Sequence, residues 1–543
     1  MTLKRLIVYL IVCAIAGSVA GEFMGAVLVR NSTKSLLKEQ AWIEKNGYIG
    51  VPGTRLREEQ SSSATYFKAG LFFSLSVGLA YGILWGILYI VSFTLLADAV
   101  CSISLRLKGR VSEELNGKER ELNTQRVRNA FSFLFILLCG VVIFYVRSIG
   151  WRMLWPFGIF LFIIPIVCSL TGYYFFEVNS YYNYKNILIY FIGFVIFFSL
   201  THFLFTSYLS ARDFIRIRDQ MLLKTHWGKK VDKFYYHYTL YAAEVIKSFN
   251  KKLQVSLKTD ESFGTSKEAE PIKKILARHD IFSGPDAPSN SILKKEGDTI
   301  QMISTTFGKA MIETDAGSFL ADVTTFLDEF DKKTDGTHFL RFCIRVSLFF
   351  LLPLFLILLI YLIFLILVQT IYSFFLTQNA LFVTIVTVIL LVILLITGRI
   401  GFSHPSSKLT IAEQMEIIVG KREGDRAGAI FSIVEKGIRE ESEKILSPYI
   451  PDIVSMLKDK DPLIRKWGII FLRKIEYKKA SDSLIAALKD SDFDVAYNAA
   501  RALGSLGSRK AINPLLEILH ESSHWYLRLN AYCALKRLGW RQG

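Results

Sequence analysis

The chain has 543 residues, 52% of them hydrophobic and 42 of them phenylalanine, which is too apolar for an ordinary soluble protein. Its formal net charge of +17 is spread along the chain without a recognisable nucleic-acid-binding motif, so we expect no nucleic-acid partner. We expect a membrane protein whose basic residues lie beside anionic lipid headgroups.

Long apolar segments predict helices that cross a membrane. About seven segments reach the roughly 20 mostly apolar residues that a spanning helix needs. They are residues 6–28, 69–97, 130–147, 153–175, 187–208, 344–370 and 380–398. Lys4 and Arg5 before the first segment also fit a cleaved signal peptide, but the apolar character continues through Val29 and favours a retained helix.

Two ionisable residues inside predicted spans form an intramembrane polar pair in our hypothesis. Glu22 lies in the later part of the first span and His202 in the later part of the fifth, and these two spans run in the same direction. Their side chains are therefore expected at a similar depth, where ionisable groups often mark function. The pair would either relay a proton or lock two helices together, and the structural lock is the simpler interpretation.

Glycines recur at close spacing in the first two predicted spans. Small residues four apart let helix backbones approach each other, so these two spans are expected to pack closely. The glycines are Gly17 and Gly21 in the first span and Gly70, Gly78, Gly82 and Gly86 in the second.

A long polar insert, residues 209–340, separates the fifth and sixth predicted spans. Its first part is a basic and aromatic helical arm. Tyrosine and tryptophan rings favour the headgroup layer, so we interpret the aromatic cluster of this arm as an interfacial anchor, with a ligand or lipid platform as the alternative. The cluster is formed by Tyr235, Tyr236, His237 and Tyr238.

The rest of the insert is expected to form a small α+β domain. Two short β-prone runs around Phe307 and Gly308 predict a hairpin, and residues 318–333 repeat apolar side chains at helical spacing. The acidic side chains of this helix lack the spacing of a calcium loop, so we interpret them as a solvated face. They are Asp322, Asp328, Glu329 and Asp331.

Sequence motifs give little support for catalysis. The chain contains no GxxxxGK[ST], GxGxxG or GxSxG pattern and no CxxC pair. His520 and His524 are four residues apart, but they flank a predicted turn between helices, so we expect no metal site there. No cofactor is expected, and an enzyme is the less favoured class.

The C-terminal tail repeats with a period of about 31 residues. Its units start at Ile450, Ser481 and Ile512, and Leu457, Leu488 and Leu519 occupy equivalent positions in them. Each unit has an apolar helix, a polar turn and a second helix rich in small residues, and stacked neighbours would bury the apolar faces. A degenerate extra unit is expected within residues 411–446.

These units resemble the short HEAT-like repeats that are also found in phycobilisome lyases. The resemblance implies an α-solenoid with a surface for another protein, and without a bilin-attachment motif we do not carry over the lyase activity. Exposed residues on the second helices are the candidate contacts with that protein partner. They are Lys466, Arg473, Tyr497, Arg501 and Arg528.

Together these features predict a mainly α protein: a polytopic helical membrane bundle, a small α+β insert and a C-terminal HEAT-like α-solenoid. The parts are the bundle (1–208), the insert (209–340), two more spans (341–400), a linker with a degenerate repeat (401–446) and the repeats (447–543). Span parity and the bias of Lys and Arg predict an inner or plasma membrane protein with a cytoplasmic tail.

The leading functional hypothesis is a membrane scaffold or adaptor whose HEAT-like tail binds or regulates a partner protein. One alternative is a transporter or channel component that is gated through its tail. The other is a membrane enzyme that acts on a lipid-linked substrate. The sequence indicates neither the partner nor the oligomeric state.

Overall fold

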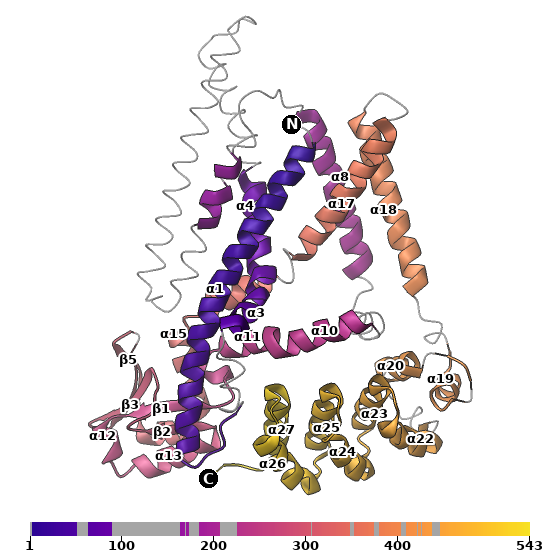
Figure 1. Cartoon of the computed structure of the whole chain (residues 1–543). Helices are drawn as coiled ribbons and strands as arrows, with labels where there is room; N and C mark the ends of the chain where they lie inside the picture. The colour runs from indigo at the N-terminus through magenta and orange to yellow at the C-terminus, as the bar shows by residue number, and fades with distance from the viewer. Residues whose placement is uncertain are drawn as a thin grey trace, which may run out of the picture.

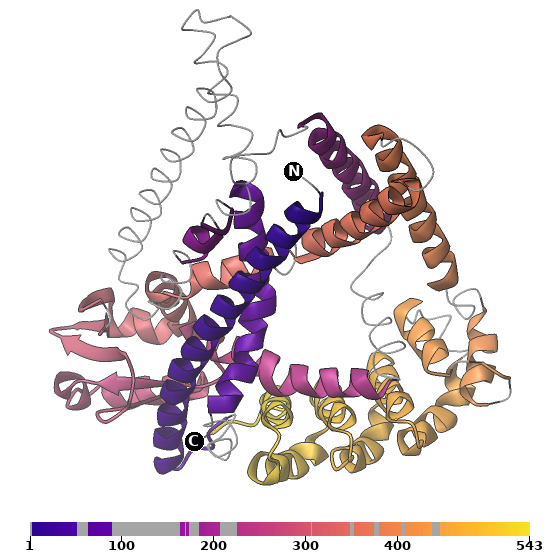
Figure 2. The ribbon, with the colours of Figure 1, turned by 45° about the horizontal axis from the view of Figure 1, so that its top comes forward.

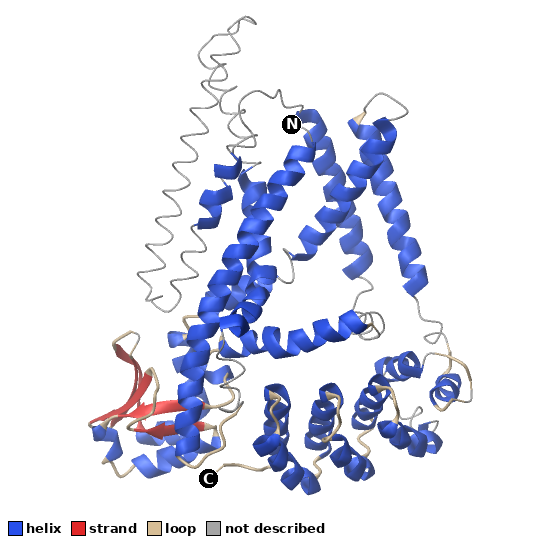
Figure 3. Cartoon of the chain, in the orientation of Figure 1, coloured by secondary structure: helices blue, strands red, loops and turns tan. Residues whose placement is uncertain are grey.

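A computed structural model shows a mainly helical protein with one small sheet (Figures 1 and 3). It describes residues 3–51, 63–89, 163–168, 170–172, 184–206, 225–305, 307–347, 352–373, 379–402, 409–420, 422–424, 426–436 and 446–542. All structural statements below concern these residues.

The longest helix, α1 (Leu3–Lys45), packs along a second helical segment. That segment consists of α3 (Ser63–Phe73), a π-helical turn η2 (Ser74–Gly78) and α4 (Leu79–Tyr89). A Cβ atom added to Gly17 would lie 2.2 Å from the carbonyl oxygen of Gly78, and one added to Gly82 would lie 2.1 Å from the carbonyl oxygen of Cys13. The backbones therefore approach as closely as the glycine spacing predicts.

Three helices are long and apolar enough to cross a membrane: Val8–Lys45, Thr65–Tyr89 and Leu354–Tyr372. Shorter apolar helices occupy Ile163–Gly172, Ile189–Thr201 and Ala380–Leu394. The predicted span at 130–147 lies outside the described residues. Among the described residues, the structure therefore supports three spanning helices by length and composition, and the count of about seven stays a prediction.

Three apolar helices form a second group: α8 (Tyr184–Thr206), α17 (Leu352–Ser373) and α18 (Ala380–Phe402). Phe197, Tyr361 and Leu391 are buried where they meet, and the Tyr361 hydroxyl donates a hydrogen bond to the carbonyl of Tyr190 at 2.9 Å. Figure 1 shows this group beside the one that contains α1.

The arm of the insert is a helix with a π-helical turn in its middle. It comprises α10 (His226–Phe234), η6 (Tyr235–Thr239) and α11 (Leu240–Val245). The Thr225 hydroxyl accepts a hydrogen bond from the Gly228 N–H at 2.9 Å and caps the start of α10. In Figures 1 and 2, α10 crosses between the apolar helices and the C-terminal repeats.

A five-stranded sheet forms the rest of the insert, in the order β2-β1-β3-β4-β5. Its strands are β1 (Val255–Thr259), β2 (Ile281–Gly284), β3 (Ser291–Glu296), β4 (Thr299–Ser304) and β5 (Lys309–Asp315). Strand β1 is parallel to β2 and β3, whereas β3, β4 and β5 are antiparallel. The hairpin β4–β5 turns at Gly308, whose φ of 67° favours glycine.

Four helices accompany the sheet: α12 (Glu261–Gly264), α13 (Ala269–Arg278), α14 (Ala316–Ala321) and α15 (Val323–Thr334). Their apolar sides bury Phe263, Leu276, Phe319 and Phe330 against the strands. The helix predicted after the hairpin is therefore present, with a break at Asp322 that divides it into α14 and α15.

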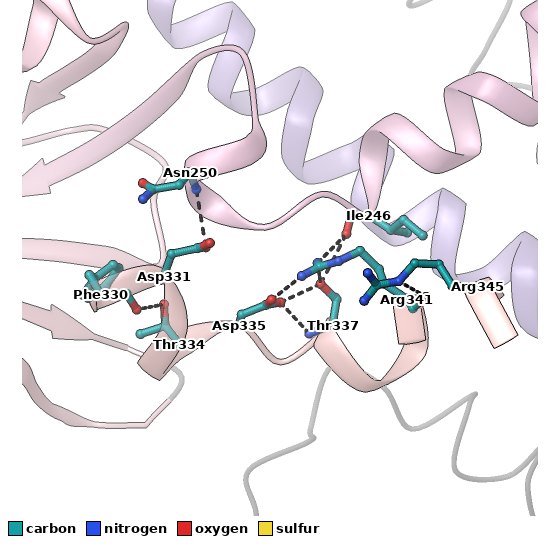
Figure 4. Close-up of polar contacts among 9 residues, drawn as sticks. All are labelled: Ile246, Asn250, Phe330, Asp331, Thr334, Asp335, Thr337, Arg341 and Arg345. Carbon is teal, nitrogen blue, oxygen red and sulfur yellow. Dashed lines mark hydrogen bonds and ion pairs between the residues drawn. The ribbon is translucent and has the colours of Figure 1, made fainter. Parts of the chain in front are cut away.

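The two ends of the insert are tied together at its base (Figure 4). The carbonyl oxygen of Ile246, which ends the arm, accepts hydrogen bonds from Arg341 Nη1 and Thr337 Oγ1, both at 3.2 Å. Arg341 also pairs with the Asp335 carboxylate in the turn before α16 (His338–Val346). Chain entering and chain leaving the domain are thus held at one point.

The C-terminal part is a row of helix pairs (Figure 1). Two helices, α19 (Ile411–Ile418) and α20 (Arg426–Lys436), precede three repeat units. The first helices of these units are α22 (Ile450–Ser455), α24 (Ser481–Ala487) and α26 (Ile512–Glu521). The second helices are α23 (Pro462–Lys474), α25 (Phe493–Leu506) and α27 (Trp525–Arg537). The limits assigned above to the parts of the chain remain predictions.

Candidate interaction surface

The repeat units are built as their sequence pattern predicts. Leu457, Leu488 and Leu519 are buried in a continuous core that runs through all three units. Asp461 accepts a hydrogen bond from the Leu463 N–H, and Asp492 accepts one from the Asp494 N–H, each at 2.9 Å. A polar turn with an aspartate cap thus starts the second helix in two of the three units.

Ion pairs connect the turns of neighbouring units. The Arg465 guanidinium donates two hydrogen bonds of 2.7 Å to the Asp490 carboxylate, and this interaction raises the pKa of Arg465. Arg426 pairs with Asp459 at 2.8 Å in the same way, one unit earlier. Because Arg465 is largely covered and its pair with Asp490 is bidentate, this pair is the stronger of the two links between stacked units.

Small residues allow the second helices to stack closely. A Cβ atom added to Gly504 on α25 would lie 2.7 Å from the Cα atom of Ala534 on α27. Ala499, Ala500 and Ala502 are completely buried on the same helix. The small residues of the pattern are therefore required by the contact between second helices.

The arm of the insert docks on the second helices of the array. Tyr236 is buried, and its ring centroid lies 5.0 Å from that of Phe493, 5.8 Å from that of Tyr497 and 5.3 Å from that of Tyr526. The Tyr236 and Tyr497 hydroxyls are 3.1 Å apart, and Trp525 Nε1 donates to the Tyr236 carbonyl at 3.2 Å. Burial raises the pKa of Tyr497.

A polar junction joins the end of the array to two distant segments. Gln542 Nε2 donates to the Ile49 carbonyl at 3.1 Å and to the Tyr532 hydroxyl at 3.0 Å. Gln254 Nε2 donates to the same carbonyl at 2.8 Å, and Gln254 Oε1 accepts the Val51 N–H at 2.8 Å. The end of α1, the sheet and the last repeat therefore meet at one buried network.

Asp280 completes this junction from the edge of the sheet. It is buried, has a φ of 61°, and accepts hydrogen bonds from the Tyr532 hydroxyl and the Lys536 ammonium group. Burial and the Asp280 carboxylate raise the pKa of Tyr532. The members of this junction are far apart in the sequence and belong to no motif, so no sequence pattern predicts it.

The candidate partner contacts on the second helices have different surroundings. Lys466, Tyr497 and Arg528 are 3%, 5% and 5% exposed, so the expectation that they face solvent is wrong. Lys466 pairs with Asp494, Tyr497 meets the arm, and Arg528 Nη2 donates to the Gly50 carbonyl at 3.3 Å. Arg473 is half-buried and Arg501 is exposed.

Exposed basic residues concentrate at the C-terminal ends of the second helices and in the turns that follow them. We call this set, together with the exposed Arg501 of α25, the basic edge. Burial lowers the pKa of the half-buried Arg473, and the positive charges of Arg501 and Arg537 lower it further. The basic edge consists of Lys474, Lys478, Lys479, Arg501, Arg509, Lys510, Arg537 and Arg541.

The predicted aromatic cluster of the arm is divided between two environments. Tyr236 is buried against the array, whereas Tyr235 is 44% exposed. Tyr238 is half-buried and accepts a hydrogen bond from Lys68 Nζ at 3.4 Å. The side chain of His237 lies outside the described residues.

The intramembrane pair stays a prediction. Glu22 is half-buried on α1, but the side chain of His202 lies outside the described residues. The two residues belong to different helix groups, since α1 packs with α3 and α4 whereas α8 packs with α17 and α18.

The acidic residues of α14 and α15 serve local structure. Asp322 caps α15 by accepting the Thr325 N–H at 3.0 Å, and this backbone hydrogen bond lowers the pKa of Asp322 to about 2. Asp328 accepts a hydrogen bond from Asn250 Nδ2 at 2.6 Å, and Asp331 accepts the Asn250 N–H at 3.4 Å. Glu329 pairs with Lys333 at 2.7 Å.

Residues 520–524 read HESSH, which has the letter pattern of a zinc metalloprotease motif. That motif needs both histidines on one face of a continuous helix. Here α26 ends at Glu521 and α27 begins at Trp525, and the ring of His524 stacks on Phe493 with centroids 4.4 Å apart. Within the described residues, no group of three or more His, Cys, Asp or Glu is placed to hold a metal ion.

Comparison with known proteins identifies the repeats. Residues 450–536 match the family model for HEAT repeats. The phycocyanobilin lyase subunit alpha of a Picosynechococcus species is 40% identical over 76 residues, which cover 13% of this chain and 28% of that relative. No solved structure matches the chain. The C-terminal part of this chain is therefore a HEAT-repeat array.

Proposed function

We propose that this protein is an integral membrane scaffold whose HEAT-repeat array binds an acidic surface of a partner protein. In this proposal the predicted spans, about seven in number, anchor the chain in the cell membrane. The array lies on the cytoplasmic side, where the bias of Lys and Arg around the spans puts it.

The observation that carries the proposal is the way the array is held. Tyr236 of the arm packs on the second helices of the array. The end of the array is held by the hydrogen bond from Gln542 to Ile49 and by the pair of Lys536 with Asp280. The basic edge remains exposed. An array with one side fixed to the rest of the chain and another side exposed is suited to present a binding surface at a defined place.

The charge of the basic edge indicates the chemistry of the partner. Burial lowers the pKa of the adjacent Arg473, and the positive charges of Arg501 and Arg537 lower it further; an acidic side chain would relieve this repulsion. Arginine forms planar two-point hydrogen bonds with carboxylates, so Asp- or Glu-rich protein segments are the favoured ligands. Among the described residues, Asp482 lies 3.6 Å from Lys510 and neutralises only part of this charge.

Charge reversal on the basic edge tests the proposal. The triple variant Arg501→Glu, Arg509→Glu and Lys510→Glu changes exposed side chains only, so we expect the array to stay folded and in place. We expect it to lose proteins that co-purify with the full-length chain in mild detergent, as identified by mass spectrometry. Deleting residues 447–543 is a poorer test, because the deletion would also uncover Tyr236 and Asp280.

A matched control carries the same change of charge elsewhere. Lys267→Glu, Lys274→Glu and Arg278→Glu replace three exposed basic residues of the insert. The control is expected to retain the partner. Equal recovery of the same proteins with both triple variants would contradict the proposal.

A further inference from the structure

Helix α10 carries an apolar face that differs from the side that packs on the array. Trp227, Val231, Phe234 and Tyr235 recur at the i, i+4, i+7 and i+8 spacing of one helical stripe. Trp227 is 75% exposed, Val231 52% and Tyr235 44%. The helix thus presents large apolar side chains outward along more than two turns.

The buried residues of the arm helix lie on another side of it. Gly228 and Tyr236 are buried, and Tyr236 meets the aromatic residues of the second helices. Trp227 and Tyr235 each come one position before a buried residue, Gly228 and Tyr236, so their stripe is rotated by roughly 100° from the buried side. Docking on the array therefore leaves the apolar stripe exposed.

Exposed basic side chains occupy the rest of the helix surface, with Lys230 beside the apolar stripe and Lys233 and Lys229 further round. Lys229, Lys230 and Lys233 are exposed, and Lys230 Nζ lies 5.1 Å from the centre of the Trp227 ring. A cation over an indole face is held by the ring quadrupole. Lysine stems of this kind extend along an apolar surface while the ammonium group stays with anions at the surface.

The position of α10 decides which partner fits this face. In Figures 1 and 2 the helix runs between the apolar helices and the array, with its outer end below α8. This is the level at which the headgroup layer would lie if those helices cross a bilayer. Tryptophan and tyrosine favour that layer, and basic amphipathic helices lie in its plane.

We propose that α10 is a membrane-surface helix that binds anionic lipid through Trp227, Val231 and the flanking lysines. It would hold the array at the bilayer, with one side in the headgroups and the other on the repeats. This inference rests on the membrane insertion that the proposed function includes, but not on the protein partner or the basic edge.

The test uses the full-length chain in lipid nanodiscs. Emission from Trp227 is obtained as the difference between the wild type and Trp227→Phe. One set of nanodiscs contains phosphatidylcholine brominated in the upper part of the acyl chains, and a second set adds phosphatidylglycerol. We expect bromine to quench the Trp227 emission, with stronger quenching when the anionic lipid is present.

Lysine variants show whether charge is responsible. Replacing Lys229, Lys230 and Lys233 with Gln should remove the enhancement by phosphatidylglycerol. The control Lys267→Gln, Lys274→Gln and Arg278→Gln should keep it, because these residues belong to the insert domain. Equal enhancement in both triple variants would overturn the assignment of the lysines to anionic lipid.

Two further results would overturn the inference in distinguishable ways. If acrylamide in the water quenches the Trp227 emission fully and the brominated lipid does not, Trp227 lies in solvent although the chain is in the nanodisc. Protection from both quenchers places a protein segment over the stripe. A chain that does not elute with nanodiscs would overturn membrane insertion and this inference together, whereas loss of partner binding alone would leave the inference standing.

Discussion

Replacing Tyr236 with Ala should release the arm from the repeat array. The variant removes a buried ring that contacts Phe493, Tyr497 and Tyr526 at centroid distances of 5.0, 5.8 and 5.3 Å. Such aromatic contacts contribute about 0.5–1.5 kcal/mol each beyond burial, and truncating a buried aromatic residue costs about 3–5 kcal/mol. We therefore expect the free energy of docking to fall by about 3–5 kcal/mol.

Hydrogen–deuterium exchange measures this loss in the intact chain. A weakening of 3 kcal/mol raises the equilibrium constant for opening by roughly a hundredfold. Amides in residues 226–245 and 493–506 should therefore exchange faster by about that factor. The apolar helices α8, α17 and α18 should exchange as before, because they form a separate packed group.

Two variants at the same place serve as controls. Tyr236→Phe keeps the ring and loses only the hydroxyl that lies 3.1 Å from the Tyr497 hydroxyl, which should cost about 1 kcal/mol. Tyr235→Ala truncates a neighbour that is 44% exposed and meets the Tyr236 ring edge-on at 5.4 Å, and it should weaken docking by no more than about 0.5–1.5 kcal/mol. If Tyr236→Ala and Tyr235→Ala showed the same exchange, our account of the docking contact would be refuted.

Other predictions concern packing, pH and the polar junction. Gly78→Leu should separate α1 from α4, because a Cβ there would lie 2.4 Å from the carbonyl oxygen of Gly17. Thermal unfolding should show a loss of about 1–3 kcal/mol. In the control Gly264→Leu, where nothing lies within 4 Å, we expect no packing clash. Because the pKa of Asp322 is lowered in the folded state to about 2, its stabilisation of α15 is present above the ordinary value of 3.8 and is lost as the pH falls through about 2. Asp322→Asn should therefore exchange faster than the wild type across α15 at neutral pH and equally at the acid limit, and a constant difference would contradict the assignment. Gln254→Ala should lose both hydrogen bonds to the segment after α1 and lower stability by about 1–3 kcal/mol, measured by denaturant unfolding; no change would show that the junction is not needed.

Local features were predictable because they depend on neighbours in the sequence. Apolar residues at helical spacing, aspartate caps such as Asp461 and Asp492, and small residues such as Gly504 predict the repeat helices and their stacking. The glycines at 17 and 78 predict the close approach of two helices for the same reason, since only small residues permit it.

The burial of the candidate contacts was not predictable in this way. Lys466, Tyr497 and Arg528 occupy positions that a helix pattern assigns to solvent, yet all three are buried. Lys466 pairs with Asp494 of the next repeat, whereas Tyr497 and Arg528 are covered by segments far away in the chain. The arm covers Tyr497, and the chain after α1 covers Arg528. Periodicity within a helix cannot show which distant segment will pack on its exposed side.

The sequence by itself determined that the chain is apolar, mainly helical and ends in HEAT repeats, because hydrophobic spacing and the repeat period act over short distances. Only the tertiary structure decided that the arm and the polar junction fix one side of the array and leave the basic edge and the outer stripe of α10 exposed. These contacts join residues hundreds of positions apart, and their energy depends on shape and hydrogen-bond geometry that exist only after the elements have packed.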